Sequence, residues 1–127
     1  MAVTVAESIL DSTKKLIGID PSDTSFDTDI IIDINTVFVI LNQMGIGPDY
    51  CFSIADNTTK WVDFTGEIKV LEAVKSYIAL KVKMMFDPPT SSSVADATNR
   101  MISELESRLS YACEPTLAQQ ASNETEE

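Results

Sequence analysis

The sequence predicts a mainly helical protein: a four-helix, bundle-like chain with a short hairpin or extended loop between the second and third helices and an extended C-terminal tail. Three observations lead to this prediction. Apolar residues recur at spacings of three and four over long stretches, which is the period of an amphipathic helix. Glycine and proline residues separate these stretches. Hydrophobic residues make up 44% of the 127 positions, which is enough for one core.

The chain is expected to divide into a helical domain and a short tail. Residues 1–114 contain all four helical patterns, so they should form one domain. Residues 115–127 are rich in Gln, Ser and Glu and contain few apolar side chains. Such a composition cannot pack a core, and we therefore expect a polar, acidic tail.

The first two helices are predicted over residues 4–17 and 28–44. Thr4 and Glu7 have the spacing of a capping box, and Gly18 can end the first helix. Gly45 closes the second helix in the same way. The main apolar face of the second helix consists of Ile30, Ile31, Ile34, Val37, Phe38 and Leu41.

The second predicted helix also carries a smaller apolar stripe. Ile32 and Val39 are seven residues apart and point away from the main face, among polar residues. One interpretation is that they are ordinary exposed aliphatic residues, which are common on any surface. The other is a contact with another subunit or a partner, and this is our hypothesis. Ile40 and Leu117 are further candidates for the contact.

An irregular segment is expected over residues 45–66. Residues 52–54 and 61–64 alternate between apolar and polar, which fits either a short hairpin or an extended loop. An isolated hairpin is at best marginally stable in water, so the segment should lie on the helices. Phe52, Trp61 and Phe64 are expected to anchor it there rather than to form a ligand cage.

The third helix is predicted over residues 67–86. It should end there because Pro88 and Pro89 follow. Proline lacks a backbone N–H, and it pushes the preceding residue out of helical geometry.

A lysine falls within the apolar face of this third helix. A helical wheel places Lys81 between Val74, Tyr77 and Met85. The long aliphatic part of its side chain can pack on the apolar face while the ammonium extends into water. Alternatively, the ammonium can pair with Asp63 or Asp56 of the irregular segment, or with an acid of a neighbouring subunit. We predict pairing of some kind, because a half-buried ammonium without a partner is costly.

The last helix is predicted from Ser92 or Ser93 to about Cys113. Either serine can cap its first turn, and Pro115 is expected to end it. Its apolar stripe is expected to contain Val94, Met101, Ile102, Leu105, Leu109 and Ala112.

Composition argues against several classes of function. The formal charge is −11, from 20 acidic and 9 basic residues, which disfavours binding to nucleic-acid phosphates or anionic membranes. There is no histidine, and the two cysteines have no metal-binding spacing. No phosphate loop or nucleophile motif is present. We therefore expect no catalytic residue, no cofactor and no metal site, and no apolar run reaches the roughly 18 residues of a membrane span.

Several segments occur in an informative order. They are residues 41–48 (LNQMGIGP), 52–56 (FSIAD), 61–66 (WVDFTG) and 77–89 (YIALKVKMMFDPP). Together they resemble the phage head–tail connector proteins, the adaptors below the portal in long-tailed double-stranded-DNA phages. The similarity extends over residues 6–114, and the tail after Pro115 has no counterpart in it.

The resemblance implies a structural protein and no enzyme. It implies a helical protomer in a homo-oligomeric ring, dodecameric in form, located in the virion neck and assembled in the cytoplasm of the bacterial host. The implied partners are the portal and the tail completion or stopper protein, with DNA passing through the ring without specific binding and with no membrane contact. The acidic charge suits such a passage if it faces the lumen, because it repels phosphate.

A second class of function remains open from the residues alone. The chain can be a soluble helical regulatory module that binds another protein through Ile32 and Val39. The acidic charge can face outward as well as toward a lumen. Binding to a portal separates the two classes.

Overall fold

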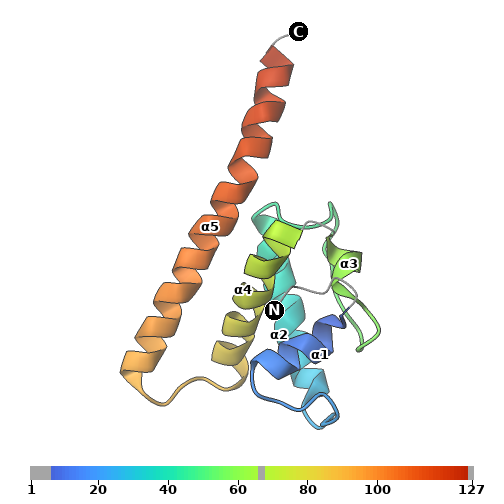
Figure 1. Cartoon of the computed structure of the whole chain (residues 1–127), viewed down its shortest axis with the longest axis vertical. Coiled ribbons are helices and arrows are strands. Elements are labelled where there is room, and N and C mark those ends of the chain that lie inside the picture. The colour runs from blue at the N-terminus through green and yellow to red at the C-terminus, as the bar shows by residue number, and fades with distance from the viewer. Residues whose placement is uncertain (1–6, 66–67, 126–127) are drawn as a thin grey trace.

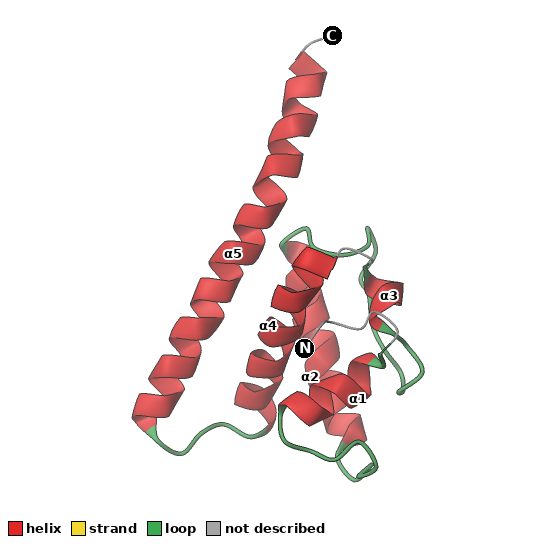
Figure 2. Ribbon diagram, in the orientation of Figure 1, coloured by secondary structure: helices red, strands yellow, loops and turns green. Residues whose placement is uncertain are grey.

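The described part of the chain contains five helices (Figures 1 and 2). The computed structural model describes residues 7–65 and 68–125, with the backbone alone for 68–69 and 111–125. The helices are α1 (Ile9–Leu16), α2 (Asp27–Gln43), α3 (Trp61–Phe64), α4 (Ile68–Phe86) and α5 (Ser92–Thr125). The described part contains no strand, so the mainly helical prediction is confirmed.

Helix α4 occupies the centre of the arrangement. It packs against α2, α5 and α1, and Figure 1 shows it between α5 and α2. One face of α4 is buried through Leu71, Val74, Tyr77, Ile78 and Val82. Helix α5 runs back along α4, and its C-terminal half extends beyond the other helices (Figure 1). The outward faces of α2 and α5 therefore form two separate sides of the protein.

Helix α1 begins later than predicted. Ser8 is its N-cap, and the Ser8 side chain accepts a hydrogen bond from the Asp11 backbone N–H at 3.2 Å. Ser8 also forms an antiparallel bridge with Lys60. Glu7 thus precedes the helix, and its carboxylate pairs with the Lys75 ammonium at 3.0 Å. The predicted start at Thr4 lies outside the described residues.

The ends of α2 and α4 agree with the prediction. Helix α2 ends at Gln43, and Gly45 follows with a φ of +81°, a conformation that favours glycine. Helix α4 ends at Phe86, before Pro88 and Pro89. Local backbone rules therefore place the end of α4 correctly and the end of α2 within one residue.

The segment between α2 and α4 is a loop with a short helix and not a hairpin. Residues 61–64 form α3, because Trp61 and Phe64 are three positions apart and both turn toward the core. Asp63 supports this turn, since its carboxylate accepts a hydrogen bond from the Lys60 backbone N–H at 2.9 Å. The alternation of apolar and polar residues suggested extended backbone, and that interpretation was wrong for α3.

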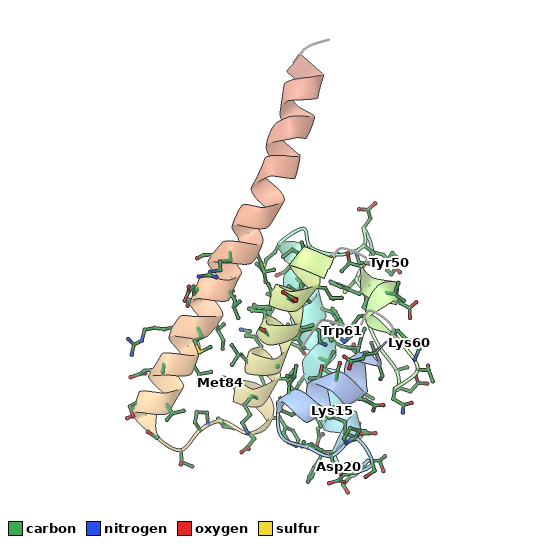
Figure 3. All side chains as sticks on the ribbon, in the orientation of Figure 1. Lys15, Asp20, Tyr50, Lys60, Trp61 and Met84 are labelled. Carbon is green, nitrogen blue, oxygen red and sulfur yellow. The ribbon has the colours of Figure 1, made fainter. Side chains whose placement is uncertain are left out.

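The three predicted aromatic anchors are buried. Phe52 and Phe64 pack with Phe38 of α2, with ring centroids 4.9 to 5.3 Å apart. Trp61 is fully buried and donates from its Nε1 to the Ser12 Oγ at 2.8 Å. In Figure 3, Trp61 lies beside α1, whereas Tyr50 and Lys60 lie at the outer edge. These rings fix the loop onto α1 and α2.

The side chain of Asn35 adds a second attachment. Its amide donates to the Ile54 carbonyl at 3.0 Å and accepts from the Ile54 backbone N–H at 2.8 Å. Asn42, two turns later on α2, donates to the Tyr50 carbonyl at 3.2 Å. These two asparagines thus hold the loop along α2.

Both the backbone conformation at position 47 and the closeness of the Phe64 side chain require glycine there. Its φ is +93°, and a Cβ atom there would lie 2.5 Å from the Phe64 Cε1. We expect Gly47→Ala to lower the free energy of unfolding by about 1–3 kcal/mol, measured by urea denaturation. Gly45→Ala is the matched control, because Gly45 has a φ of +81° but nothing within 4 Å. Equal urea midpoints for the two variants would show that the contact with Phe64 is unimportant.

Helix α5 is longer than predicted. It continues through Pro115 to Thr125, so the described residues 115–125 are not an extended tail. A proline inside a helix costs one backbone hydrogen bond, but it does not forbid the helix. The following Leu, Ala and Gln residues have high helix propensity, which favours continuation.

Candidate interaction surface

The described side chains offer no metal-binding cluster. No group of three or more His, Cys, Asp or Glu residues among them could hold a metal ion. Within the described part, no helix is both long and apolar enough to cross a membrane.

The predicted apolar stripe of α2 is exposed. The exposed fraction is 58% for Ile32 and 42% for Val39, whereas Ile30, Ile34 and Val37 on the main face are fully buried. Ile40 is half-buried and packs against the core, so it lies at the edge of this surface. Leu117 lies on α5 where only the backbone is described. We call Ile32 and Val39 the α2 stripe.

A cavity of about 320 Å³ opens at the first turns of α2. It is lined by Asp29, Ile32, Asp33, Met85 and Phe86. The start of α2 and the end of α4 meet here because Phe26 packs edge-on against Phe86, with ring centroids 5.3 Å apart. The α2 stripe therefore runs into a hollow that joins the start of α2 to the end of α4, and we call it the corner cavity. The sequence pattern pointed to Ile32 but not to its neighbours from α4.

Two carboxylates share the wall of the corner cavity. Asp29 and Asp33 are four residues apart, so they lie on the same side of α2. Partial burial, together with the negative charge of Asp29, raises the pKa of Asp33 above its usual range. No ion pair or hydrogen bond engages either side chain among the residues that the structure describes. The lining of the cavity therefore combines two carboxylates with three apolar side chains.

Helix α5 carries a second set of exposed apolar side chains. Val94 and Met101 are seven residues apart and have exposed fractions of 52% and 53%. Among the described side chains of α5, Ile102 and Leu109 are buried and Leu105 is partly buried, whereas Ala112 lies where only the backbone is described. The predicted single stripe of α5 is thus divided between the core and the surface.

Lys81 does not form the predicted ion pair with either candidate. The Asp63 carboxylate accepts from the Lys60 N–H, and the Asp56 carboxylate accepts from the Thr58 N–H at 2.9 Å. The ion pairs of the described residues belong to Lys14, Lys75, Lys83 and Arg108. An acid of a neighbouring subunit as the partner of Lys81 stays a prediction.

Among the described residues, the fully buried cation is Lys14, in the last turn of α1. Its side chain is 1% exposed, and its Nζ lies 2.7 Å from the Asp27 Oδ1. The same Nζ donates to the Pro21 carbonyl at 3.0 Å. The turn between α1 and α2 folds over this lysine, and no feature of α1 alone predicts that. Lys14 thereby joins α1, the turn and the first residue of α2.

Tyr77 links α4 to α5 through a hydrogen bond. Its hydroxyl donates to the Glu106 carboxylate at 2.9 Å. Burial, and then the hydrogen bond to Glu106, raises the pKa of Tyr77 well above its usual range. The neutral phenol is therefore the form that the fold requires.

Stability should fall at alkaline pH because of Tyr77. Its pKa is raised in the fold, so its contribution is present below the unfolded value of about 10 and is lost as pH rises above it. At pH 8 we expect Tyr77→Phe to lower the free energy of unfolding by about 1 kcal/mol. At pH 11 that difference should shrink or reverse, as urea midpoints would show. Tyr50→Phe, at an exposed tyrosine, controls for the general effect of alkali, and a constant difference would contradict the prediction.

The fold and the surface together define a class of protein. Among the described residues, the buried polar side-chain atoms are paired. Exposed apolar side chains lie on α2 and α5, and two acids lie beside those of α2, as expected of a helical protein that works by contact with other proteins. A model of the phage connector protein family matches residues 9–116, and the chain belongs to this family. The resemblance inferred from the sequence is thereby confirmed. No significant match was found among curated proteins or solved structures.

Proposed function

We propose that the chain is a structural adaptor of the virion neck. In this proposal it forms a ring, dodecameric as the resemblance implies, between the portal and the tail-side stopper or completion protein. The family match over residues 9–116 is the observation that carries the proposal. The protein acts by contact and not by catalysis, and it is assembled in the cytoplasm of the bacterial host.

The exposed faces of two helices support assembly into a ring. A closed ring of identical subunits needs two different contact surfaces on each copy. The α2 stripe supplies one, with Ile40 at its edge, and the exposed Val94 and Met101 of α5 supply the other. Leu117, where only the backbone of α5 is described, stays a candidate for a further contact.

The charge supports a passage that does not retain DNA. Binding to phosphates requires clustered Lys and Arg side chains. The chain has 9 basic and 20 acidic residues. Four of the basic residues, Lys14, Lys75, Lys83 and Arg108, already form ion pairs. A lumen lined by such subunits would let DNA move without specific binding.

Mixing the purified chain with the portal and the stopper protein of the same phage tests the proposal. We expect a complex with at least one of them, visible as a ring by electron microscopy. We also expect the chain in purified particles, detected by mass spectrometry. The alternative, a soluble helical regulatory module, predicts neither result. Absence from particles together with failure to bind either protein would overturn the adaptor role.

A further inference from the structure

We propose that the α2 stripe of one copy packs against Val94 and Met101 of the next copy, with the two helices parallel and Arg100 beside Asp29. We call Val94 and Met101 the α5 pair. This inference rests on the proposed function and deepens it, because it names the partner of each surface and the direction of their contact. It also assigns Arg100 a role in selecting that partner.

The α2 stripe and the α5 pair match in length and in chemistry. Each consists of two exposed apolar side chains seven residues apart, so each extends over about 10.5 Å along its helix. Seven residues are nearly two full turns, and both side chains of each set therefore point the same way. Between them lie the exposed Thr36 on α2 and the exposed Ala97 on α5. The distance between packed helices depends on the side chains at the contact, so these small residues permit a close approach.

The direction of the contact follows from the fold and from the small rotation between copies in a large ring. Helix α2 begins where α4 ends, at the pair Phe26 and Phe86, and α5 runs back along α4 (Figure 1). Both helices therefore run opposite to α4 and in roughly the same direction. Neighbouring copies in a ring of twelve are related by a rotation of about 30°, so no helix changes direction by more than that from one copy to the next. The α2 of one copy and the α5 of the next are thus roughly parallel.

The positions of charged residues favour the parallel contact. At 3.6 residues per turn, Asp29 lies on one flank of the α2 stripe, and Arg100 lies on the flank of the α5 pair that faces it when the helices are parallel. In an antiparallel contact Arg100 would lie on the opposite flank, beside Asn35. Asp29 and Arg100 are both exposed and belong to none of the ion pairs of the described residues. Glu104, on the same flank as Arg100, is already paired with Arg108 at 2.6 Å.

A second copy supplies what α2 lacks. Helix α2 contains three acidic residues and no basic one. Each copy has a formal charge of −11, so most of its surface would repel this helix. The α5 pair is an exception, because these apolar side chains lie beside an arginine that has no ion pair in the described part of the chain. Both halves of the contact are thus present on one chain, as a closed ring requires.

Mixing two complementary variants tests whether the two surfaces contact each other. One variant carries Ile32→Asp with Val39→Asp, and the other carries Val94→Asp with Met101→Asp. All four side chains are exposed, so both variants should fold, and their urea midpoints would check this. Association is measured by sedimentation velocity at high concentration; a wild-type chain that associates only on the purified portal is compared there by chemical cross-linking. We expect wild type to form large assemblies, each variant alone to stay monomeric, and an equimolar mixture to form dimers and nothing larger.

Exchanging two charges tests the direction of the contact. Arg100→Asp should weaken association by about tenfold or more, because it places two acids side by side. Adding Asp29→Arg in the same chain should restore association, since the ion pair is then present in the reverse order. The control is Lys15→Asp, at an exposed cation of α1 that belongs to none of the ion pairs of the described residues, and it should change association little. Association that Asp29→Arg does not restore would overturn the parallel contact.

The remaining outcomes separate this contact from the adaptor role. If the variant with Val94→Asp and Met101→Asp still dimerises alone, the α2 stripes pair with each other and the proposal is overturned. A mixture without dimers, together with wild-type rings on the portal, would also overturn the contact but leave the adaptor role standing. If wild type neither associates nor binds the portal or the stopper, the adaptor role fails and the proposed contact fails with it.

Discussion

Replacing both Ile32 and Val39 by aspartate should leave a folded chain that no longer joins heads to tails. Both side chains are exposed, so neither replacement removes a core contact. In an interface, desolvated apolar residues of this kind are each worth about 1–3 kcal/mol, so the two together should weaken the contact by roughly 25-fold to more than 10⁴-fold. The measurement is the yield of infectious particles when the variant complements a phage that lacks the protein.

A matched pair of exposed residues controls for added charge. Tyr50 and Val62 are 64% and 51% exposed and lie outside the α2 stripe. Tyr50→Asp with Val62→Asp should leave particle assembly near the wild-type level. Normal yield from the Ile32→Asp and Val39→Asp variant, or equal loss from both pairs, would show that the α2 stripe is ordinary surface.

Asp27→Ala should produce the largest loss of stability. The Lys14 side chain is 1% exposed, and its ammonium lies 2.7 Å from the carboxylate of Asp27, whose side chain is 27% exposed. Removing one partner of a buried pair leaves an uncompensated charge and costs about 3–5 kcal/mol. Urea denaturation would measure this loss. Asp29→Ala is the control, because Asp29 lies in the same first turn of α2 but is exposed.

The double variant separates charge burial from other effects of Asp27. With Lys14→Met the buried ammonium is absent, so adding Asp27→Ala should cost little more. The losses in free energy of unfolding of the two single variants should therefore sum to more than the loss measured for the double variant. Simple additivity would mean that Lys14 is stabilised by the Pro21 carbonyl and by packing, and not by Asp27.

The sequence predicted those parts of the fold that local rules govern. The 3.6-residue period identified α2 and α4, while Gly45, Pro88 and Pro89 marked where they end. The same period showed that Ile32 and Val39 face away from the core, as their exposure confirms. Each of these features depends on backbone conformation or on the wheel position of a residue within its own helix.

Features that depend on distant residues were missed. Helix α1 starts at Ile9 because its first backbone groups pair with the loop before α3, with the Ile9 N–H donating to the Thr59 carbonyl at 3.0 Å. Lys14 is buried because the turn through Pro21 returns over it. The corner cavity needs Met85 and Phe86 beside α2, and no periodicity within either helix contains that information.

The central position of α4 has a consequence for the size of a ring. Neighbouring copies are related by a rotation of about 30° in a ring of twelve and of about 28° in a ring of thirteen, so the two rings differ by about 2° per contact. The outward faces of α2 and α5 are oriented chiefly by their packing on α4, and helix crossing angles vary among proteins by about 15–20°. In the proposed ring, a substitution at a buried position of α4 such as Val74 or Ile78 would therefore be able to change the number of subunits without altering any residue of the proposed contact surfaces.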